Sequence, residues 1–108
     1  MGKFEVYKNK SGEFRFRLKA GDGQTILASE GYTSKAARDN GVESVRKNAS
    51  DEKRYTNGVS TSNQSYFNLT ATDSQIIGKS EMYDSESARD NGIQSVMNTA
   101  PEARVVES

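Results

Sequence analysis

The stretch SKAARDNGVESV at residues 34–45 decides the fold, because it returns as SESARDNGIQSV at residues 85–96. An ungapped shift of 51 residues aligns Phe16–Ala49 with Phe67–Ala100, and 18 of these 34 pairs are identical. Such a match indicates a tandem duplication, in which each copy is one structural unit that packs against the other.

The length and composition limit how the two copies are arranged. A unit of about 50 residues buries too little surface to be stable alone, whereas 108 residues are enough for one domain of ordinary size. We therefore expect residues 1–108 to form a single domain made of two repeats, residues 1–56 and residues 57–108. A hydrophobic content of 32% and a mean hydropathy of −0.86 indicate that the shared core is thin.

The quoted stretch has the spacing of an amphipathic helix in both copies. A glycine inside a helix costs about 1 kcal/mol relative to alanine, so Gly41 and Gly92 indicate that each helix lies too close to the sheet for a side chain. A turn at each Asn-Gly pair is the alternative, and the unbroken spacing favours the helix. Thr33 or Ser34 is the expected N-cap, and Pro101 is expected to end the second helix. The spacing is carried by Ala37, Gly41, Val45 and Ala49 in the first copy and by Ala88, Gly92, Val96 and Ala100 in the second.

Upstream of the first helix, apolar and polar residues alternate as they do in half-buried strands. In the clearest strand, Phe14–Ala20, the apolar side chains share one face, while Arg15, Arg17 and Lys19 share the other. Sequential strands joined by short turns predict an antiparallel meander. The other segments with strand character are Phe4–Lys8, Gln24–Ser29 and Tyr66–Ala71.

The remaining segments complete a predicted fold. Short extended segments are expected after the helices, at Lys53–Tyr55 and Ala103–Val106, with the polar stretch Asn57–Gln64 as the seam between the copies. Each unit then reads as β-β-β-α-β. The predicted fold is α+β: two units related by a pseudo-twofold axis share one antiparallel sheet, and both helices cover the same face. The residues leave open whether the C-terminal strand of each unit is exchanged with the other, because a short polar strand carries little register information.

A longer repeated pattern connects the chain to a known family. ExYxSxxAxxxGVxSV begins at Glu30 and recurs as ExYxSxxAxxxGIxSV from Glu81, with FxLxA upstream at Phe16. This doubled pattern resembles the YegP-like family, a small bacterial domain of unknown function, over essentially the whole chain. The resemblance implies a β3-α-β unit, one combined sheet and exchange of the last strand between units. It implies no activity.

The residue types present exclude several classes of chemistry. The sequence contains no cysteine and no histidine, so it offers no disulfide, no thiolate and neither the commonest general base nor the commonest metal ligand. We therefore expect a protein that is not an enzyme and that carries no cofactor and no metal. No stretch approaches the roughly 20 apolar residues needed to cross a bilayer, and the N-terminus shows no apolar signal segment. A cytoplasmic location without membrane contact is expected.

One candidate binding surface is the outward face of the strand Phe14–Ala20. There Arg15, Arg17 and Lys19, with Tyr66 nearby, would hold a polyanion such as single-stranded nucleic acid. An ordinary solvated sheet face is the alternative, and the net charge of zero favours that alternative.

Other repeated polar residues are weaker candidates. Glu30 and Glu81 precede the two helices, and we expect them to pair with Arg or Lys or with backbone N–H groups near the helix starts. A tripeptide that is identical in the two copies would line two equivalent sites, and an exposed helical face with local ion pairs is the alternative. It consists of Arg38, Asp39 and Asn40 in the first copy and of Arg89, Asp90 and Asn91 in the second.

The charge distribution suggests what kind of partner to expect. Residues 1–50 hold 10 basic and 6 acidic residues, a net charge of +4, whereas residues 51–108 hold 5 and 9, a net charge of −4. Opposite charges on the two halves would permit head-to-tail self-association. The first hypothesis for function is a non-catalytic interaction module that binds a protein partner or a second copy of itself. The alternative is a weak binder of polyanions or single-stranded nucleic acid on the open sheet face.

Overall fold

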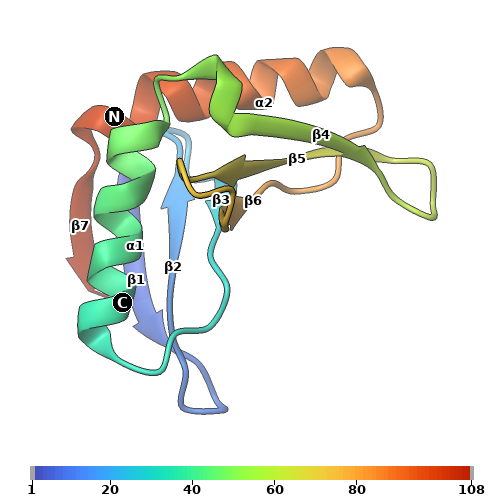
Figure 1. The fold of residues 1–108 in the computed structure, drawn as a ribbon. Coiled ribbons are helices and arrows are strands. Elements are labelled where there is room, and N and C mark those ends of the chain that lie inside the picture. Colours follow the sequence, from blue (N-terminus) through green and yellow to red (C-terminus); the bar gives the residue numbers. More distant parts are fainter. Residues whose placement is uncertain (1, 108) are drawn as a thin grey trace.

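Two α-helices and a seven-stranded sheet make up residues 2–107 of the computed structural model (Figure 1). The α-helices are α1 (Lys35–Asn48) and α2 (Glu86–Thr99), and each is followed by a short 3₁₀ helix, η1 (Glu52–Arg54) or η2 (Ala100–Glu102). The strands are β1 (Lys3–Lys8), β2 (Phe14–Lys19), β3 (Thr25–Ala28), β4 (Tyr55–Val59), β5 (Ser65–Thr70), β6 (Ile76–Lys79) and β7 (Arg104–Glu107). Their order in the sheet is β4-β5-β6-β3-β2-β1-β7.

Both helices begin at a serine cap and run unbroken through their central glycine. The hydroxyls of Ser34 and Ser85 each accept a hydrogen bond from the amide three residues later, at 3.1 and 3.0 Å. Gly41 and Gly92 lie inside α1 and α2, so the helical prediction is confirmed and the alternative of an Asn-Gly turn is wrong. The predicted lack of space is also confirmed, because a Cβ on Gly41 would lie only 2.6 Å from the Tyr32 hydroxyl.

The sheet is mixed, and the prediction of a purely antiparallel sheet is therefore wrong at one edge. β7 runs parallel to β1, with Lys3 opposite Arg104. Gly2, just before β1, lies against Thr99 at the end of α2, so the chain enters β7 beside the start of β1 and continues in the same direction. The last strand of the chain therefore pairs with the first.

The opposite edge of the sheet also differs from the sequence prediction. The Asp51 carboxylate accepts a hydrogen bond from the Lys53 amide at 3.0 Å and caps η1, so most of the extended segment expected at Lys53–Tyr55 is a 3₁₀ helix. β4 follows and takes in three residues of the seam expected at Asn57–Gln64. β4 serves both as the last strand of the first repeat and as the first strand of the second. The sheet therefore has seven strands, whereas two separate β-β-β-α-β units would give eight. The expected repeat boundary, between residues 56 and 57, falls inside β4.

Both helices cover the same face of the sheet, and the core lies between them and the strands. Phe16 on β2 and Phe67 on β5 are fully buried there. Each phenyl ring stacks against a tyrosine that precedes a helix, with centroids 6.3 Å apart for Phe16 and Tyr32 and 6.4 Å apart for Phe67 and Tyr83. The alternation of strand residues therefore turns the intervening polar side chains to the uncovered face.

The two halves of the sheet meet where β3 pairs with β6. Ala28 lies opposite Lys79, and these two residues are equivalent under the 51-residue shift. Their neighbours Leu27 and Gly78 are equivalent as well, and Leu27 is fully buried. A Cβ on Gly78 would lie 2.6 Å from Leu27 Cγ. The junction therefore has room for the side chain of one repeat only.

Candidate functional site

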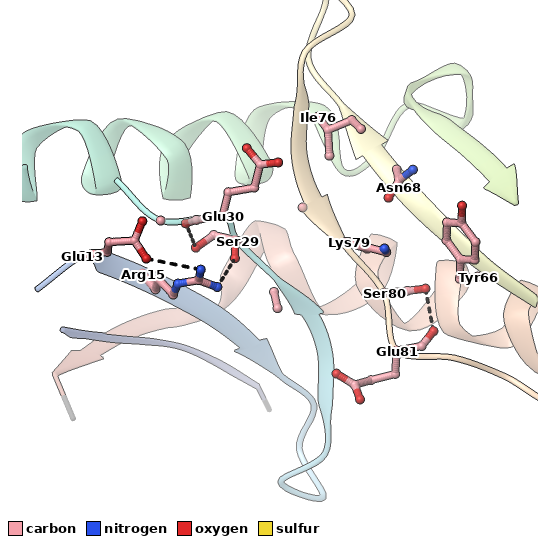
Figure 2. Close-up of a pocket in the computed structure, with 13 residues that line it drawn as sticks. Glu13, Arg15, Ser29, Glu30, Tyr66, Asn68, Ile76, Lys79, Ser80 and Glu81 are labelled. Carbon is pink, nitrogen blue, oxygen red and sulfur yellow. Dashed lines mark hydrogen bonds and ion pairs between the residues drawn. The ribbon is translucent and has the colours of Figure 1, made fainter. Parts of the chain in front are cut away.

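A groove of about 850 Å³ lies on the face of the sheet that the helices leave uncovered (Figure 2). Arg15 on β2 lines one side of it, and Tyr66 and Asn68 on β5 line the other. The groove thus crosses the β3–β6 junction between the two repeats. Glu30 and Glu81, which follow β3 and β6, lie on opposite sides of this junction in the view of Figure 2.

Two equivalent serines fix the chain segments that leave β3 and β6. Ser29 Oγ accepts a hydrogen bond from the Phe16 amide at 2.9 Å and donates one to the Glu30 carbonyl at 2.8 Å. Ser80 makes the equivalent two bonds in the second repeat, also at 2.9 and 2.8 Å. Both serines are buried. They hold the backbone that places Glu30 and Glu81 at the groove.

Both buried side-chain atoms that have no hydrogen-bond partner within residues 2–107 belong to residues that line the groove. One is Arg15 Nε, a donor, and the other is Asn68 Oδ1, an acceptor. A buried polar atom left without a partner costs about 1–3 kcal/mol, and buried polar atoms in native proteins are rarely unsatisfied. To satisfy both atoms, a bound ligand would have to bring an acceptor to Arg15 on one side of the groove and a donor to Asn68 on the other.

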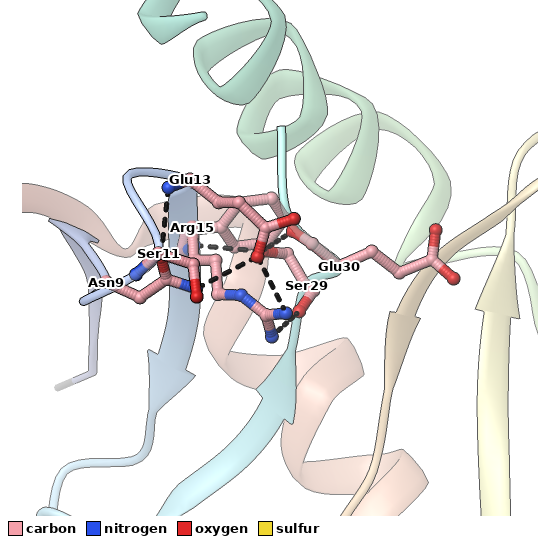
Figure 3. A network of polar contacts seen from close by, with 7 residues as sticks. Asn9, Ser11, Glu13, Arg15, Ser29 and Glu30 are labelled. Carbon is pink, nitrogen blue, oxygen red and sulfur yellow. Dashed lines mark hydrogen bonds and ion pairs between the residues drawn. The ribbon is translucent and has the colours of Figure 1, made fainter. Parts of the chain in front are cut away.

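A network of polar contacts holds Arg15 in position (Figure 3). Its Nη2 lies 3.5 Å from Glu13 Oε1, and its Nη1 donates to the Ser29 carbonyl at 3.4 Å. Asn9 Nδ2 donates to the same Glu13 oxygen at 3.0 Å. The hydrogen bond from Asn9, followed by the charge of Arg15, lowers the pKa of the Glu13 carboxyl. Glu13 therefore remains ionised, and the Arg15 guanidinium is held at the edge of the groove.

The other two cations of the predicted polyanion face lie outside the groove and pair with one carboxylate. Arg17 and Lys19 share the Glu5 carboxylate on β1, at 2.5 and 3.4 Å. Arg17 also lies over the Tyr7 ring, 4.5 Å from its centroid. The hydrogen bond from Arg17, with the charges of both cations, lowers the pKa of the Glu5 carboxyl. Two of the three positive charges that the sequence analysis singled out are therefore engaged within the sheet.

Replacing Glu5 by glutamine should lower the free energy of unfolding by about 1 kcal/mol at pH 7. Because the pKa of Glu5 is lowered on folding from its ordinary value of 4.5, this stabilisation is present above pH 4.5 and is lost as the pH falls through the folded value. The difference between wild type and Glu5→Gln should therefore shrink in acid, as measured by urea denaturation at pH 7 and pH 3. A matched change at the exposed Glu107 on β7, in Glu107→Gln, should show no such convergence. A constant difference at both pH values would contradict the ion-pair explanation.

The structure divides the predicted polyanion face into two parts. Arg15 and Tyr66 line the groove together, from opposite sides. Arg17 and Lys19 do not line it. A cation that the sequence analysis missed takes their place: Lys79 on β6, whose ammonium lies 5.0 Å from the centroid of the Tyr66 ring.

The groove is slightly acidic. Its charged lining consists of the carboxylates of Glu13, Glu30 and Glu81 and the cations of Arg15 and Lys79, three negative charges against two positive, or a net charge of −1. A polyanion would be repelled by this excess of carboxylates, although it would meet a cation and an aromatic ring at Lys79 and Tyr66.

The repeated Arg-Asp-Asn tripeptides do not contribute to the groove. Arg38 and Arg89 are buried, 6% and 8% exposed, and each donates from Nε and Nη2 to the carboxylate of the following aspartate. Arg38 also lies over the Phe14 ring at 5.7 Å. The expected exposed helical face with local ion pairs is therefore only partly correct, because the arginines are covered. The exposed members are Asp39, Asn40, Asp90 and Asn91.

Glu30 and Glu81 do not form the pairs that the sequence analysis expected. Both residues are exposed, and no hydrogen bond or ion pair engages either carboxylate within the described part of the chain, residues 2–107. Their charges act on the tyrosines that precede the helices. Burial, and then the charge of Glu30 or Glu81, raises the pKa of Tyr32 and of Tyr83.

Three kinds of groove residue escaped the sequence analysis, for different reasons. Asn68 occupies the strand position that Arg17 holds in the first repeat, and an asparagine in a strand is a weak signal. Ser29 and Ser80 belong to a repeated Ser-Glu pair that marks where the chain leaves β3 and β6. For Lys79 no signal is visible, because its place depends on the pairing of β3 with β6.

Residues 2–107 offer neither a carboxylate metal site nor a membrane-spanning helix. No group of three or more acidic side chains is placed to hold a metal ion. Neither α-helix is long and apolar enough to cross a membrane.

Comparison with known proteins gives consistent matches over most of the chain. A family model described as "Domain of unknown function (DUF1508)" matches residues 9–55 and again residues 60–107. A "UPF0339 protein in ptx operon 5'region" from Stutzerimonas stutzeri is 57% identical over 106 residues, which cover 98% of this chain and 96% of that protein. The UPF0339 protein YegP of Escherichia coli K12 is 48% identical over 95 residues, covering 88% of this chain and 86% of that protein.

Two solution NMR structures have the same fold. A UPF0339 protein from Shewanella oneidensis, 46% identical, superposes with a TM-score of 0.92 and covers 98% of this chain and 90% of its own. The yegP protein of unknown function from E. coli, 44% identical, superposes with a TM-score of 0.94 and covers 99% and 92%. The seven-stranded arrangement with two helices is therefore shared with experimentally determined relatives.

Proposed function

This chain belongs to the YegP (UPF0339) family defined by the DUF1508 domain, and on that premise we propose that it is a non-catalytic interaction module of the cytoplasm whose groove binds a protein partner. One observation carries the proposal. The two buried side-chain atoms without a hydrogen-bond partner in residues 2–107, Arg15 Nε and Asn68 Oδ1, belong to residues that line the same groove from opposite sides. A peptide backbone offers carbonyl acceptors and N–H donors, the two kinds of group that these atoms lack.

The ionisable groups support binding over catalysis. The sequence lacks histidine and cysteine. The Glu5 and Glu13 carboxyls on the uncovered face have lowered pKa values because of hydrogen bonds from Arg17 and Asn9 respectively. A general acid at neutral pH needs a carboxyl with a raised pKa, so these two carboxylates are suited to holding neighbouring side chains in place.

We place the groove on a pseudo-twofold axis that relates the two repeats, as in a homodimer fused into one chain. The pairing of Ala28 with its own equivalent, Lys79, supports such an axis through the β3–β6 junction. The equivalent stacks of Phe16 on Tyr32 and of Phe67 on Tyr83 support it as well. On this arrangement the module has one binding groove, built by both repeats.

Replacing Asn68 by threonine should raise the free energy of unfolding by about 1 kcal/mol, because it removes an unsatisfied buried acceptor and introduces a better strand former. A gain in stability on loss of the Asn68 amide is the result expected where that amide is retained for binding. The matched control is Thr70 on the same face of β5, whose hydroxyl donates to the Arg54 carbonyl at 3.0 Å. Thr70→Val should lose about 1 kcal/mol. Thermal and urea denaturation measure both; a destabilised Asn68→Thr would contradict the proposal.

The binding test uses a random peptide library displayed on phage and selected against the wild-type protein. Peptides that occupy the groove should bind Asn68→Thr at least about tenfold more weakly. They should bind Asn57→Thr normally, since this control makes the same change at an exposed position of β4 outside the groove. Equal binding to both variants, or failure to select any peptide, would overturn the groove as a peptide site.

A weak polyanion site is the second candidate, and one observation favours it. The Lys79 ammonium on the Tyr66 ring, opposite Arg15, joins cations and an aromatic ring in one groove, as surfaces for single-stranded nucleic acid do. Binding of oligouridylate that falls steeply with salt and is lost in Arg15→Gln/Lys79→Gln would support this candidate. The net charge of −1 in the groove favours the peptide.

A further inference from the structure

We propose that the groove selects a peptide segment in extended conformation with two basic side chains four residues apart, which pair with Glu30 and Glu81. This inference rests on the proposed peptide-binding function of the groove and specifies the partner. Both glutamates line the groove, both are exposed, and within residues 2–107 neither carboxylate has a hydrogen-bond or ion-pair partner.

These glutamates differ from the other carboxylates on the uncovered face. Glu5 is held by Arg17 and Lys19, and Glu13 is held by Asn9 and Arg15. Once these internal pairs are set aside, the charges left in the groove are two free carboxylates and the ammonium of Lys79. The remaining negative charge selects a cationic ligand over an anionic one.

The spacing follows from the antiparallel pairing of β3 and β6. Ala28 and Lys79 lie opposite each other at the junction, and the chain leaves them in opposite directions. Glu30 and Glu81 each follow two residues later, on opposite sides of the junction (Figure 2). Two residues on each side of the Ala28–Lys79 pair add up to four residue spacings. At about 3.3 Å per extended residue, they separate the two glutamates by about 13 Å along the strands.

A peptide running along β3 and β6 matches this separation with side chains at positions i and i+4. In an extended peptide these two side chains point to the same side, because successive side chains alternate. The peptide bonds between them would then pass over the middle of the groove, between Arg15 and Asn68, the residues that carry the unsatisfied donor and acceptor. Ile76, 46% exposed at the groove, offers an apolar contact for the stem of a long basic side chain.

The experiment uses the full chain labelled with ¹⁵N and a set of blocked nine-residue serine–valine peptides. One peptide carries two arginines four residues apart, and a second carries them three apart, on opposite sides of the extended chain. In a third and a fourth peptide, glutamine or glutamate replaces both arginines. The first peptide should shift the amides of Ser29–Gly31 and of Ser80–Met82 and should bind about tenfold more tightly than the other three.

A pair of double variants separates charge selection from general acidity. Glu30→Gln/Glu81→Gln should weaken binding of the first peptide by about tenfold. Glu86→Gln/Glu107→Gln makes the same change in net charge at exposed positions outside the groove and should leave the dissociation constant within about twofold.

The outcomes distinguish this inference from the proposed function beneath it. Equal affinity for the arginine and glutamine peptides, or full affinity in Glu30→Gln/Glu81→Gln, overturns the selection of basic side chains. If peptide binding is still weakened in Asn68→Thr, the proposal that the groove binds peptides is retained. Failure of the first peptide to shift the groove amides also overturns the inference, while the stability of Asn68→Thr continues to test the groove independently. Shifts with oligouridylate alone would assign the groove to polyanions.

Discussion

Gly78→Leu is expected to lower the free energy of unfolding by about 3 kcal/mol, because it places a second leucine at a junction that holds one. A Cβ at this position already lies 2.6 Å from Leu27 Cγ and Cδ2, and Leu27 is fully buried against the core of both repeats. Leu27→Gly should lower the free energy of unfolding by at least as much, since it leaves a cavity at the centre of the sheet and adds a glycine to a strand.

The informative variant combines the two changes. If the repeats are related by a twofold axis through the β3–β6 junction, Leu27→Gly/Gly78→Leu moves the same side chain to the equivalent place and should recover most of the stability. Urea denaturation of the wild type, the two single variants and the double variant gives the coupling free energy, which should exceed about 3 kcal/mol in the favourable direction. Additive losses would rule out the pseudo-twofold arrangement at this junction.

Gly41→Ala is expected to destabilise the protein by about 2 kcal/mol, although the same change in an open helix gains about 1 kcal/mol. The added methyl group would lie 2.6 Å from the Tyr32 hydroxyl and 3.0 Å from Phe16 Cε2. It would therefore push the tyrosine away from the phenyl ring on which it stacks.

Two further variants test this explanation. Asn40→Ala alters the exposed neighbour on the same helix and should be neutral or slightly stabilising. Tyr32→Phe removes the hydroxyl, so Gly41→Ala should cost less when it is made in the Tyr32→Phe background. Thermal denaturation of all four proteins measures both effects. A stabilised Gly41→Ala would show that α1 lies further from the sheet than the structure places it.

Local features of the fold follow from the sequence because local chemistry produces them. The serine hydroxyls that cap α1 and α2, and the alternation of Phe16 and Leu18 with Arg15, Arg17 and Lys19, act within a few residues of the chain. The duplication adds one long-range fact, since a repeated apolar pattern implies a repeated core face. Membership of the YegP family was also visible in this way, because its pattern lies within one β-α segment.

Features that depend on which strands become neighbours could not be predicted from the sequence. The parallel pairing of β1 with β7 depends on where α2 delivers the chain. The groove depends on β3 meeting β6, which brings Arg15 into the same site as Asn68 and Lys79. Arg17 and Lys19 looked like free cations because Glu5, with which both pair, lies on a different strand.

The pairing of β7 with β1 has a consequence for how the protein is made. Lys3 and Arg104 are 101 positions apart in the chain, so their pairing closes a loop that spans both repeats. Closing so long a loop is entropically costly, and contacts between distant residues slow folding. During synthesis, β1 keeps an unpaired edge until residues 104–107 have left the ribosome. We infer that the first repeat spends this interval as an incomplete sheet, when a β1 edge from another nascent chain can compete for the place of β7.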